Sequence, residues 1–574
     1  MEQLPLLGQI VIHVLFCILL ASFTNSHHRQ GPRSLQGNVQ QSIRVKYLEG
    51  TEYEYEFPLM GQEPKTPVEE FQQTYWTNAG VETLQQAMKK KPNTNRAKNV
   101  IMFLGDGMSL PTIAAARIFK GQRSGDPGEG TRLFFEDFPS VGLSKTYCTD
   151  TQVADSACSS TAYLCGVKGA YYTAGVNGNV RREDCASALN ESNQVNSIGK
   201  SSQIGLLFII EKKIILQWAQ TAGLATGVIT NTRITHASPS GAYAHTASRE
   251  WESDSYLGIK GSQCKDIAHQ LIFNSPGKNI NVLMGGGRRH FLPKGTPYNG
   301  SRSDGSNLIE KWNEGKHGKR AKYVGNRADL LKLDTAKTDY VLGLFASSHL
   351  EYYVDADHDN EPSLAEMTEK SIEILKNDPK GFFLFVEGDR YRPSRELGAQ
   401  SYGKTVEFEK AVQKAASMTS EEDTLIVVTA DHSHSFSLNG YPRRGQSIFG
   451  FSDEMSDMDF KPYSTLSYSN GPVKPKLDPD NTRYNLTNDN REDTGYQFSA
   501  MVHLGYETHG GDDIGVYARG PWAHLLDGQF DQTYIPIVMG YALNVLPFSA
   551  SSAISIFYRK QTRHNFISCV ICDI

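Results

Sequence analysis

Residues 98–107 read KNVIMFLGDG, an apolar run of strand length that ends on a glycine, an aspartate and a second glycine. Val, Ile and Phe are enriched in strands, and a run that is apolar at every position is typical of a strand buried on both faces. The carboxylate of Asp106 follows this run directly. We therefore expect a central strand of a parallel sheet, with Asp106 at its carboxyl end.

Further stretches repeat this arrangement of an apolar run followed by Gly, Asp, His or Ser. They are residues 226–238 (TGVITNTRITHAS), 280–287 (INVLMGGG), 340–345 (YVLGLF), 381–389 (GFFLFVEGD) and 423–435 (DTLIVVTADHSHS). Segments with helical periodicity, such as residues 363–377 (SLAEMTEKSIEILKN), alternate with these runs. Strands that alternate with helices predict an α/β fold, a doubly wound sandwich in which helices flank a large central, mostly parallel sheet.

The composition describes a large globular chain. Its 574 residues include 58 Lys and Arg against 63 Asp and Glu, which gives a net charge of −5. Because both signs are mixed along the chain, we expect no nucleic-acid partner. A hydrophobic content of 39% is sufficient for a large core, and the 8 cysteines are too few for a disulfide scaffold of this length.

The N-terminus predicts export. Residues 10–21 (IVIHVLFCILLA) form a short apolar run, followed by small and polar residues up to Ser26. The run is too short to span a bilayer comfortably and is placed like the apolar core of a signal peptide, so we assign residues 1–26 to a signal peptide. An N-terminal anchor is the alternative. Glycosylation sequons at Asn190, Asn299 and Asn485 are compatible with export.

Four of the apolar runs stop on side chains that bind hard or borderline metal ions. These side chains are Asp106, His236 with Ser238, Glu387, and Asp431 with His432. The carboxyl ends of strands in one open sheet meet at the same crevice, and mixed carboxylate and imidazole ligands suit zinc and magnesium. A single strand-end Asp or His is more often a helix cap or a structural residue. Four such ends in one chain favour a metal site.

Residues 155–166 (DSACSSTAYLCG) predict a second part of this site. Ser156 precedes small residues with helical character, and the N-terminus of a helix attracts anions through its free N–H groups and its dipole. The simpler interpretation of the Asp-Ser pair is a helix cap. A metal-activated serine is, however, what phosphoryl transfer through a covalent intermediate requires, and Arg249 could bind the non-bridging phosphate oxygens. The alternative for Arg249 is an ordinary surface position.

Six blocks, in this order, resemble successive blocks of the alkaline phosphatases across roughly Tyr53 to Ala542. They are NVIMFLGDGM (99–108), DSACSSTAYLCGVKG (155–169), THASPSGAYAHTASR (235–249), FFLFVEGD (382–389), VVTADHSHSFSLNGYPRRGQSIFG (427–450) and ETHGGDDIGVYARGPWAHL (507–525). The resemblance implies an alkaline phosphatase domain at residues 45–545. It also implies a homodimeric, secreted or glycolipid-anchored phosphomonoesterase of the metazoan type, with two zinc ions and one magnesium ion per subunit.

The resemblance also implies roles for individual residues. By position, Ser156 matches the phosphoserine nucleophile and Arg249 the phosphate-binding arginine. Asp106 matches the carboxylate that bridges magnesium and the second zinc ion. The other matches are His236, Ser238 and Glu387 in the magnesium shell, Asp431 and His432 as zinc ligands whose division between the two ions stays open, His509 in the first zinc site, and Cys185 with Cys264 as a disulfide.

The chain departs from the family at the first zinc site. After the glutamate that matches Glu387, the family continues Gly-Gly-Arg-Ile-Asp-His-Gly-His-His, and the Asp and final His of this motif bind zinc. Here Arg392 and Glu396 occupy those offsets. Arginine has no acceptor and cannot be a ligand. Two explanations stay open: the first zinc site is impaired, or residues 389–403 reflect a frame slip or a mispredicted exon edge.

Two further segments are atypical. Residues 201–217 insert an apolar block within the domain, which could be retained intron, and residues 546–574 form an atypical C-terminal tail. The tail shows no pattern of small residues, spacer and apolar run, so a glycolipid anchor is implied by the resemblance alone. We expect the protein to be secreted or held at the extracellular face of the plasma membrane.

The expected function is metal-dependent hydrolysis of phosphate monoesters at alkaline pH, through a phosphoserine at Ser156. The main alternative is a binding or receptor protein that keeps the fold but has lost turnover, because the first zinc site lacks two expected ligands. A weaker alternative is a related metallohydrolase that acts on diesters or sulfates. The combination of Ser156 with Arg249 favours monoesters.

Overall fold

The computed structural model describes residues 41–46, 52–57, 66–195, 214–256, 263–351, 356–388, 398–493 and 496–545. The predicted signal peptide, residues 201–213 of the predicted insertion, residues 389–397 with Arg392 and Glu396, and the tail at 546–574 lie outside these ranges. The chain forms two compact units, Met1–Met60 and Gly61–Ile574. In the first unit, β1 (Gln41–Lys46) and β2 (Glu52–Phe57) pair antiparallel.

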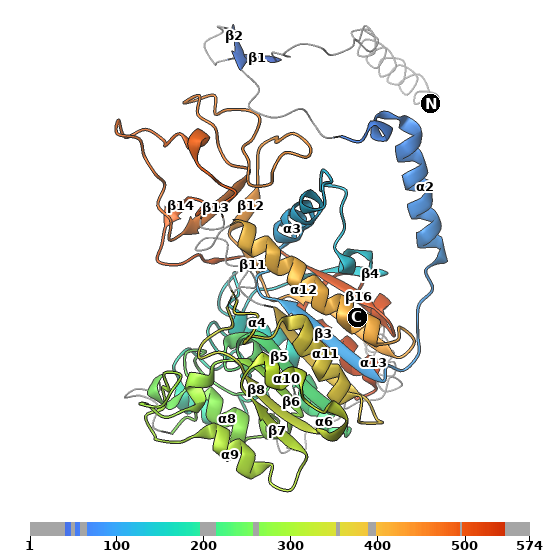
Figure 1. Ribbon diagram of the computed structural model, residues 1–574, viewed down its shortest axis with the longest axis vertical. Helices are drawn as coiled ribbons and strands as arrows, with labels where there is room; N and C mark the ends of the chain where they lie inside the picture. The colour runs from blue at the N-terminus through green and yellow to red at the C-terminus, as the bar shows by residue number, and fades with distance from the viewer. Residues whose placement is uncertain are drawn as a thin grey trace, which may run out of the picture. The chain divides into compact units, whose positions relative to one another are not determined.

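A 10-stranded sheet forms the centre of the second unit (Figure 1). Its strands, in spatial order, are β17 (Gly528–Asp531), β4 (Ser140–Lys145), β16 (Ile514–Arg519), β10 (Thr424–Ala430), β3 (Asn99–Gly105), β9 (Phe382–Gly388), β5 (Ala225–Arg233), β6 (Val282–Gly286), β8 (Tyr340–Leu344) and β7 (Ala321–Val324). From β10 to β7 all neighbours run parallel, whereas β16 is antiparallel to both β10 and β4. The predicted α/β fold with a large, mostly parallel sheet is confirmed.

All six apolar runs of the sequence are strands of this sheet, and β3 lies near its middle as expected. The sequence did not predict β4, β7, β16 or β17. The residues of β4 are alternately buried and exposed, and β7 has only 4 residues, so neither forms a continuous apolar run. β4, β7 and β17 are partly exposed toward the two edges of the sheet, whereas β16 is almost fully buried and its short run (IGVYAR) is interrupted by Gly515.

Helices cover both faces of the sheet. Successive side chains of a strand point to opposite faces, so each face presents apolar side chains that the helices bury. On β3, Ile101 and Phe103 join one core with α3 (Leu110–Arg123), α11 (Leu364–Leu375) and α12 (Gly398–Met418). Val100, Met102 and Leu104 join the other core. That core includes residues of α4 (Ser156–Cys165), α6 (Ile215–Thr221), α8 (Ile267–Phe273), α9 (Leu308–Gly315) and α13 (Ile535–Leu543). In Figure 1, α11 and α12 lie in front of the sheet.

Helix α11 shows how local sequence sets these elements. Ser363 caps its N-terminus by accepting a hydrogen bond from the Glu366 N–H, and the Glu366 side chain accepts in return from the Ser363 N–H. This reciprocal pairing satisfies two N–H groups that the helix leaves open. Helix α11 confirms the helix predicted at residues 363–377. The remaining α-helices are α2 (Gln73–Lys89), α5 (Cys185–Leu189), α7 (Ala237–Ser240) and α10 (Arg327–Leu331).

The end of the predicted insertion belongs to the core. Ile214, Ile215 and Leu216 are fully buried, and α6 begins at Ile215. Apolar side chains here pack in the same core as α4 and α13. Residues 214–217, the last four of the predicted insertion at 201–217, therefore help to cover the sheet, and the insertion itself stays a prediction.

Besides the β1–β2 pair, the described residues form two further small sheets outside the central sheet. β11 (Ser433–His434) pairs with β15 (His509–Gly510), so that His434 lies opposite His509. β12 (Phe436–Leu438), β13 (Leu466–Gly471) and β14 (Ala500–His503) form a three-stranded sheet. Among the residues that the structure describes, no helix is long and apolar enough to cross a membrane.

Candidate active site

Four neighbouring strands bring acidic and imidazole side chains to one edge of the sheet. Asp106 follows β3, Asp431 follows β10, His236 follows β5, and Glu387 is the last residue but one of β9. These strands are adjacent in the order β10, β3, β9 and β5, and all run parallel. Their carboxyl ends therefore meet at one place, as the sequence predicted. All four side chains are buried.

Two groups of potential metal ligands share Asp106. The ligand atoms of Asp106, His236 and Glu387 lie within 4.8 Å of one another, and so do those of Asp106, Asp431 and His432. Oxygen and imidazole donors of this kind suit magnesium and zinc. The second group places Asp431 and His432 together beside Asp106, while the division of these two residues between the zinc ions stays a prediction.

The tautomer of His432 indicates that a cation fits the second group. His432 Nδ1 lies 3.0 Å from the Ser433 carbonyl, an acceptor, so Nδ1 carries the proton and Nε2 keeps its lone pair. That lone pair faces Asp431 Oδ2 at 3.1 Å and Asp106 Oδ1 at 3.7 Å. Three electron-rich atoms buried together repel one another unless a cation lies between them. The donor set therefore fits a divalent ion.

The first group is held by threonines of β5. Glu387 Oε2 accepts hydrogen bonds from Thr230 Oγ1 at 2.6 Å and from Thr232 Oγ1 at 3.1 Å. These bonds fix one carboxylate oxygen. Ser238, in α7, is fully buried, and its Oγ has no hydrogen-bond partner of ordinary geometry among the described residues. A buried hydroxyl without such a partner is unfavourable, so this atom also fits a place in the coordination shell of an ion.

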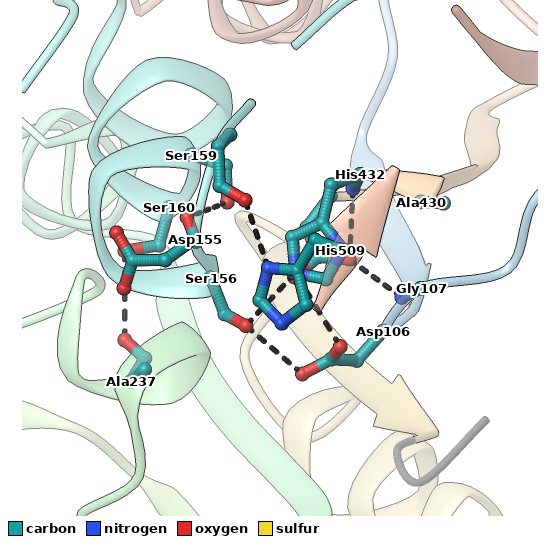
Figure 2. Close-up of polar contacts among 12 residues, drawn as sticks. Asp106, Gly107, Asp155, Ser156, Ser159, Ser160, Ala237, Ala430, His432 and His509 are labelled. Atoms are coloured by element: carbon teal, nitrogen blue, oxygen red, sulfur yellow. Dashed lines mark hydrogen bonds and ion pairs between the residues drawn. The ribbon is translucent and has the colours of Figure 1, made fainter. Parts of the chain in front are cut away.

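Ser156 lies against the group formed by Asp106, Asp431 and His432. Its Oγ is 3.3 Å from Asp106 Oδ2 and 3.1 Å from His432 Nε2. Figure 2 draws Ser156 pointing toward these two side chains. Ser156 is the first residue of α4, and Asp155 caps this helix by accepting hydrogen bonds from the Ala157 and Cys158 N–H groups. Both interpretations of the Asp-Ser pair are therefore compatible, because Asp155 is the cap and Ser156 points to the carboxylates.

Arg249 is held beside Ser156 by a buried ion pair. Its Nη1 donates to Asp155 Oδ2 at 2.9 Å, and its Nη2 donates to His236 Nε2 at 3.2 Å. Its backbone N–H donates to the Tyr172 carbonyl at 2.9 Å, while the Tyr172 N–H donates to Asp155 Oδ1 at 2.9 Å. Burial alone would lower the pKa of Arg249, but Asp155 and Asp106 outweigh burial and raise it. The guanidinium therefore stays charged.

His509 approaches the site from β15. Its ring stacks on that of His432, with 3.5 Å between the ring centroids and 16° between the planes. Its Nδ1 donates to the Ala154 carbonyl at 2.8 Å, which leaves the lone pair on Nε2. Burial, together with His432 and His434, lowers the pKa of His509 well below its usual range. His509 is thus a neutral imidazole, the form in which histidine binds metals.

The structure therefore gathers the catalytic and metal residues proposed from the sequence at one site. The predicted disulfide and glycosylation residues lie elsewhere. Cys185 and Cys264 form a disulfide, as the resemblance implied, in an apolar cluster with Trp251. The sequons at Asn190, Asn299 and Asn485 are exposed.

Sequence reasoning missed several residues that support the site. It did not identify Tyr172, Thr230 or Thr232, and it missed a second disulfide, between Cys148 and Cys158. The available signals were two threonines at alternate positions near the end of a buried strand, and two cysteines on either side of the Asp-Ser pair.

Comparisons with known proteins agree with this geometry. The sequence model of the family described as "Alkaline phosphatase" matches residues 97–545. The chain is 45% identical over 491 residues to the tissue-nonspecific isozyme of alkaline phosphatase from Rattus norvegicus, covering 83% of this chain and 89% of that protein. It is 41% identical over 491 residues to a membrane-bound alkaline phosphatase from Bombyx mori, covering 82% of this chain and 86% of that protein.

Solved structures show the same fold. The alkaline phosphatase of Thermus thermophilus superposes with a TM-score of 0.54 at 20% identity, covering 83% of this chain and 98% of that chain. The alkaline phosphatase of the Antarctic bacterium TAB5 gives a TM-score of 0.53 at 19% identity, covering 79% and 99%. Taken with the match to the family and the identity to the rat and silkworm proteins, the chain belongs to the alkaline phosphatase family.

Proposed function

We propose that Ser156 is the nucleophile of a metal-dependent phosphoric monoester hydrolase and that turnover passes through a phosphoserine at this residue. Membership of the alkaline phosphatase family makes the chain a phosphoric monoester hydrolase. The observation that carries the role of Ser156 is its position: Oγ lies within 3.3 Å of Asp106 and of His432, in the first turn of α4.

The described residues would hold two of the expected ions. Asp106, Asp431 and His432 would hold one zinc ion, and Asp106, His236 and Glu387, with Ser238 nearby, would hold magnesium. His509 would contribute to the first zinc site through Nε2. Bound there, such cations stabilise negative charge on the attacking and leaving oxygens and favour the deprotonated serine.

The side chains of the protein supply orientation and charge. The hydrogen bond of 3.3 Å to Asp106 Oδ2 orients Ser156 Oγ. Arg249, held by Asp155, offers the rest of its planar fork to the non-bridging oxygens of the phosphate. As Oγ bonds to phosphorus the ester bond breaks, and the leaving alcohol departs on the opposite side. Water then attacks the phosphoserine, releases phosphate and regenerates Ser156.

The charge states of the site support an alkaline optimum. The pKa of Arg249 is raised and that of His509 is well below neutrality, so neither group changes charge as the pH rises above 7. The serine hydroxyl, in contrast, loses its proton more readily at high pH. Activity should therefore rise on the alkaline side until substrate binding weakens.

Trapping the intermediate tests this function. Protein loaded with zinc and magnesium is mixed with p-nitrophenyl phosphate, quenched in acid and digested for mass spectrometry. We expect a phosphopeptide that contains Ser156, and we expect Ser156→Ala to lose it together with a factor of about 10³ or more in kcat. Ser124→Ala, at the exposed C-terminal end of α3, is the control.

A folded, zinc-loaded protein that neither turns over substrate nor forms the phosphopeptide would contradict this proposal. It would favour the binding-protein alternative, which rests on Arg392 and Glu396 at the offsets where the family has zinc ligands.

We also propose that the protein is exported, glycosylated and homodimeric, either secreted or held at the extracellular face of the plasma membrane. Two disulfides and the exposed sequons support export, and the silkworm relative is named as membrane-bound. Light scattering of the purified protein tests the dimer. Treatment of producing cells with a glycolipid-specific phospholipase distinguishes an anchored form, which is released, from a secreted one.

A further inference from the structure

A disulfide lies directly beside the proposed nucleophile. Cys158 is in the first turn of α4, two residues after Ser156, and Cys148 lies three residues after the end of β4. The two Cα atoms are 5.9 Å apart, a usual separation for bonded cysteines. Both side chains are buried. Because the sulfurs are bonded to each other, neither offers the thiolate that a metal ion would need.

The bridged segment carries three consecutive residues that each contact a different part of the site. The carbonyl of Ala154 accepts the hydrogen bond from His509 Nδ1 at 2.8 Å. The carboxylate of Asp155 pairs with Arg249 at 2.9 Å and caps α4. Ser156 faces Asp106 and His432. A shift of this segment would therefore move the nucleophile, the partner of the phosphate-binding arginine and the acceptor of a metal-binding histidine together.

The disulfide joins the two ends of the loop at residues 148–158, and both of these ends are buried. Ala154 packs with both cysteines in a small apolar cluster. The residues just before it, Gln152 and Val153, are exposed. Earlier in the loop, the Thr149 N–H donates to the Gly169 carbonyl at 3.0 Å, and Asp150 Oδ1 accepts from the Tyr171 N–H at 2.8 Å. The bonds within the loop are few and local: the Cys148 N–H donates to the Thr151 carbonyl, and Thr151 Oγ1 donates to the Val153 carbonyl. The disulfide adds a covalent bond between Cys148, at the start of the loop, and Cys158 in α4.

The length of the loop separates local positioning from overall stability. Cys148 and Cys158 are 10 positions apart, whereas Cys185 and Cys264 are 79 positions apart. A cross-link restricts the unfolded chain more when it closes a longer loop. The Cys185–Cys264 disulfide should therefore contribute more to overall stability than the Cys148–Cys158 disulfide. It lies in a separate apolar cluster, with Val180 and Trp251.

We propose that the Cys148–Cys158 disulfide is a positioning element of the active site, which holds residues 154–156 against His509 and Arg249. This inference rests on the proposed function, because it takes Ser156, Arg249 and His509 as parts of the machinery. It assigns to two residues outside the predicted site a role in phosphate binding and in the orientation of His509.

Two double variants of the full-length protein test the proposal, Cys148→Ala/Cys158→Ala and, as the matched control, Cys185→Ala/Cys264→Ala. Each is purified, loaded with zinc and magnesium, and compared with the parent protein. The measurements are phosphate affinity by calorimetry, zinc content after dialysis, kcat and KM for p-nitrophenyl phosphate, and the midpoint of thermal unfolding.

We expect Cys148→Ala/Cys158→Ala to lower phosphate affinity and kcat/KM by about 10- to 100-fold, because small displacements of catalytic groups have effects of this size. The control should show a lower unfolding midpoint, with phosphate affinity and zinc content unchanged. Loss of affinity in proportion to loss of thermal stability in both variants would overturn the proposal, as would unchanged affinity in the first variant.

A second measurement covers the case in which the first variant does not fold. The folded parent protein is treated with a water-soluble phosphine, which takes oxygen from water to form the phosphine oxide while the disulfide gains two electrons and two protons and becomes two thiols. Alkylation and peptide mapping then show which disulfide has opened. Phosphate affinity should fall as Cys148 and Cys158 become alkylated, and full affinity after their alkylation would overturn the proposal.

These results separate the proposal from the function on which it rests. Phosphate affinity and zinc content do not require turnover. A parent protein that binds phosphate but forms no phosphoserine would contradict the role of Ser156, whereas the positioning role of the disulfide would still be decided by the change in affinity.

Discussion

Ser156 Oγ lies 3.1 Å from His432 Nε2, although 276 positions of sequence separate the two residues. Ser156 begins α4, and His432 follows β10 by two residues. The contact exists because parallel strands end at a common edge of the sheet and α4 begins at that same edge. The proposed nucleophile therefore depends on the parallel centre of the fold, and its immediate surroundings yield the first prediction.

Asp106 should control the metal content of both groups. Because it belongs to each group of potential ligands, we expect Asp106→Asn to lower zinc and magnesium content together. Glu387→Gln should lower magnesium content with much less effect on zinc, since Glu387 belongs to one group only. Elemental analysis of the dialysed variants measures both. Equal loss of both metals in the two variants would contradict the division into two groups.

Arg249 should act mainly on phosphate binding. Lysine keeps the charge but lacks the planar fork, so Arg249→Lys loses the directed hydrogen bonds to Asp155 and to a phosphate. The loss of one charge-assisted hydrogen bond, about 1.5–3 kcal/mol, should weaken inhibition by inorganic phosphate about 10- to 100-fold. Arg181→Lys is the control, because Arg181 is exposed and pairs with Asp150. An unchanged inhibition constant in Arg249→Lys would argue against its role.

Glu252 should make the fold sensitive to acid. Burial alone would raise the pKa of its carboxyl, but the adjacent Arg233 outweighs burial and, with Thr235, lowers this pKa from 4.5 to about 2. Because the pKa is lower in the folded state, the stabilisation is complete above pH 4.5 and is lost as the pH falls toward 2. The shift corresponds to about 3 kcal/mol.

Urea unfolding of metal-free protein measures this effect. The difference in unfolding free energy between the parent protein and Glu252→Gln should be largest near neutral pH and should shrink between pH 4.5 and about 2. The control is Glu310→Gln, at an exposed position of α9, which should change the unfolding free energy by less than about 0.5 kcal/mol. A difference for Glu252→Gln that stays constant across this range would show that its carboxyl keeps its ordinary pKa.

The sequence predicts the centre of this fold better than its edges, for a physical reason. Strands such as β3 and β9 are buried on both faces, so every position is apolar and the run is visible in the sequence. β4 meets solvent on one face and β7 is short, so neither produces such a run. Burial on two faces leaves a signal in composition that burial on one face does not.

The same reasoning applies to the site. Asp106 and Glu387 could be predicted because they end apolar runs, and the fold requires such ends to meet. Tyr172 could not, because its hydrogen bonds are made by its backbone, an N–H to Asp155 and a carbonyl to Arg249, while its ring lies 5.5 Å from the Arg249 guanidinium. Any residue carries these backbone groups, so no side-chain pattern marks the position. Contacts of this kind become visible only when the chain path is known.

The last prediction concerns the start of α6, which lies at the end of the predicted insertion at residues 201–217. Leu216 is fully buried among residues of the core that includes α4 and α13, so Leu216→Ala should lower the unfolding free energy by about 2–5 kcal/mol. Thr221→Ala, at the exposed last residue of the same helix, should change it by less than about 0.5 kcal/mol. Chemical denaturation of the two variants measures the contrast. If residues 214–217 were part of a dispensable insertion, Leu216→Ala would be as mild as Thr221→Ala, and the packing of α6 against the sheet would have to be revised.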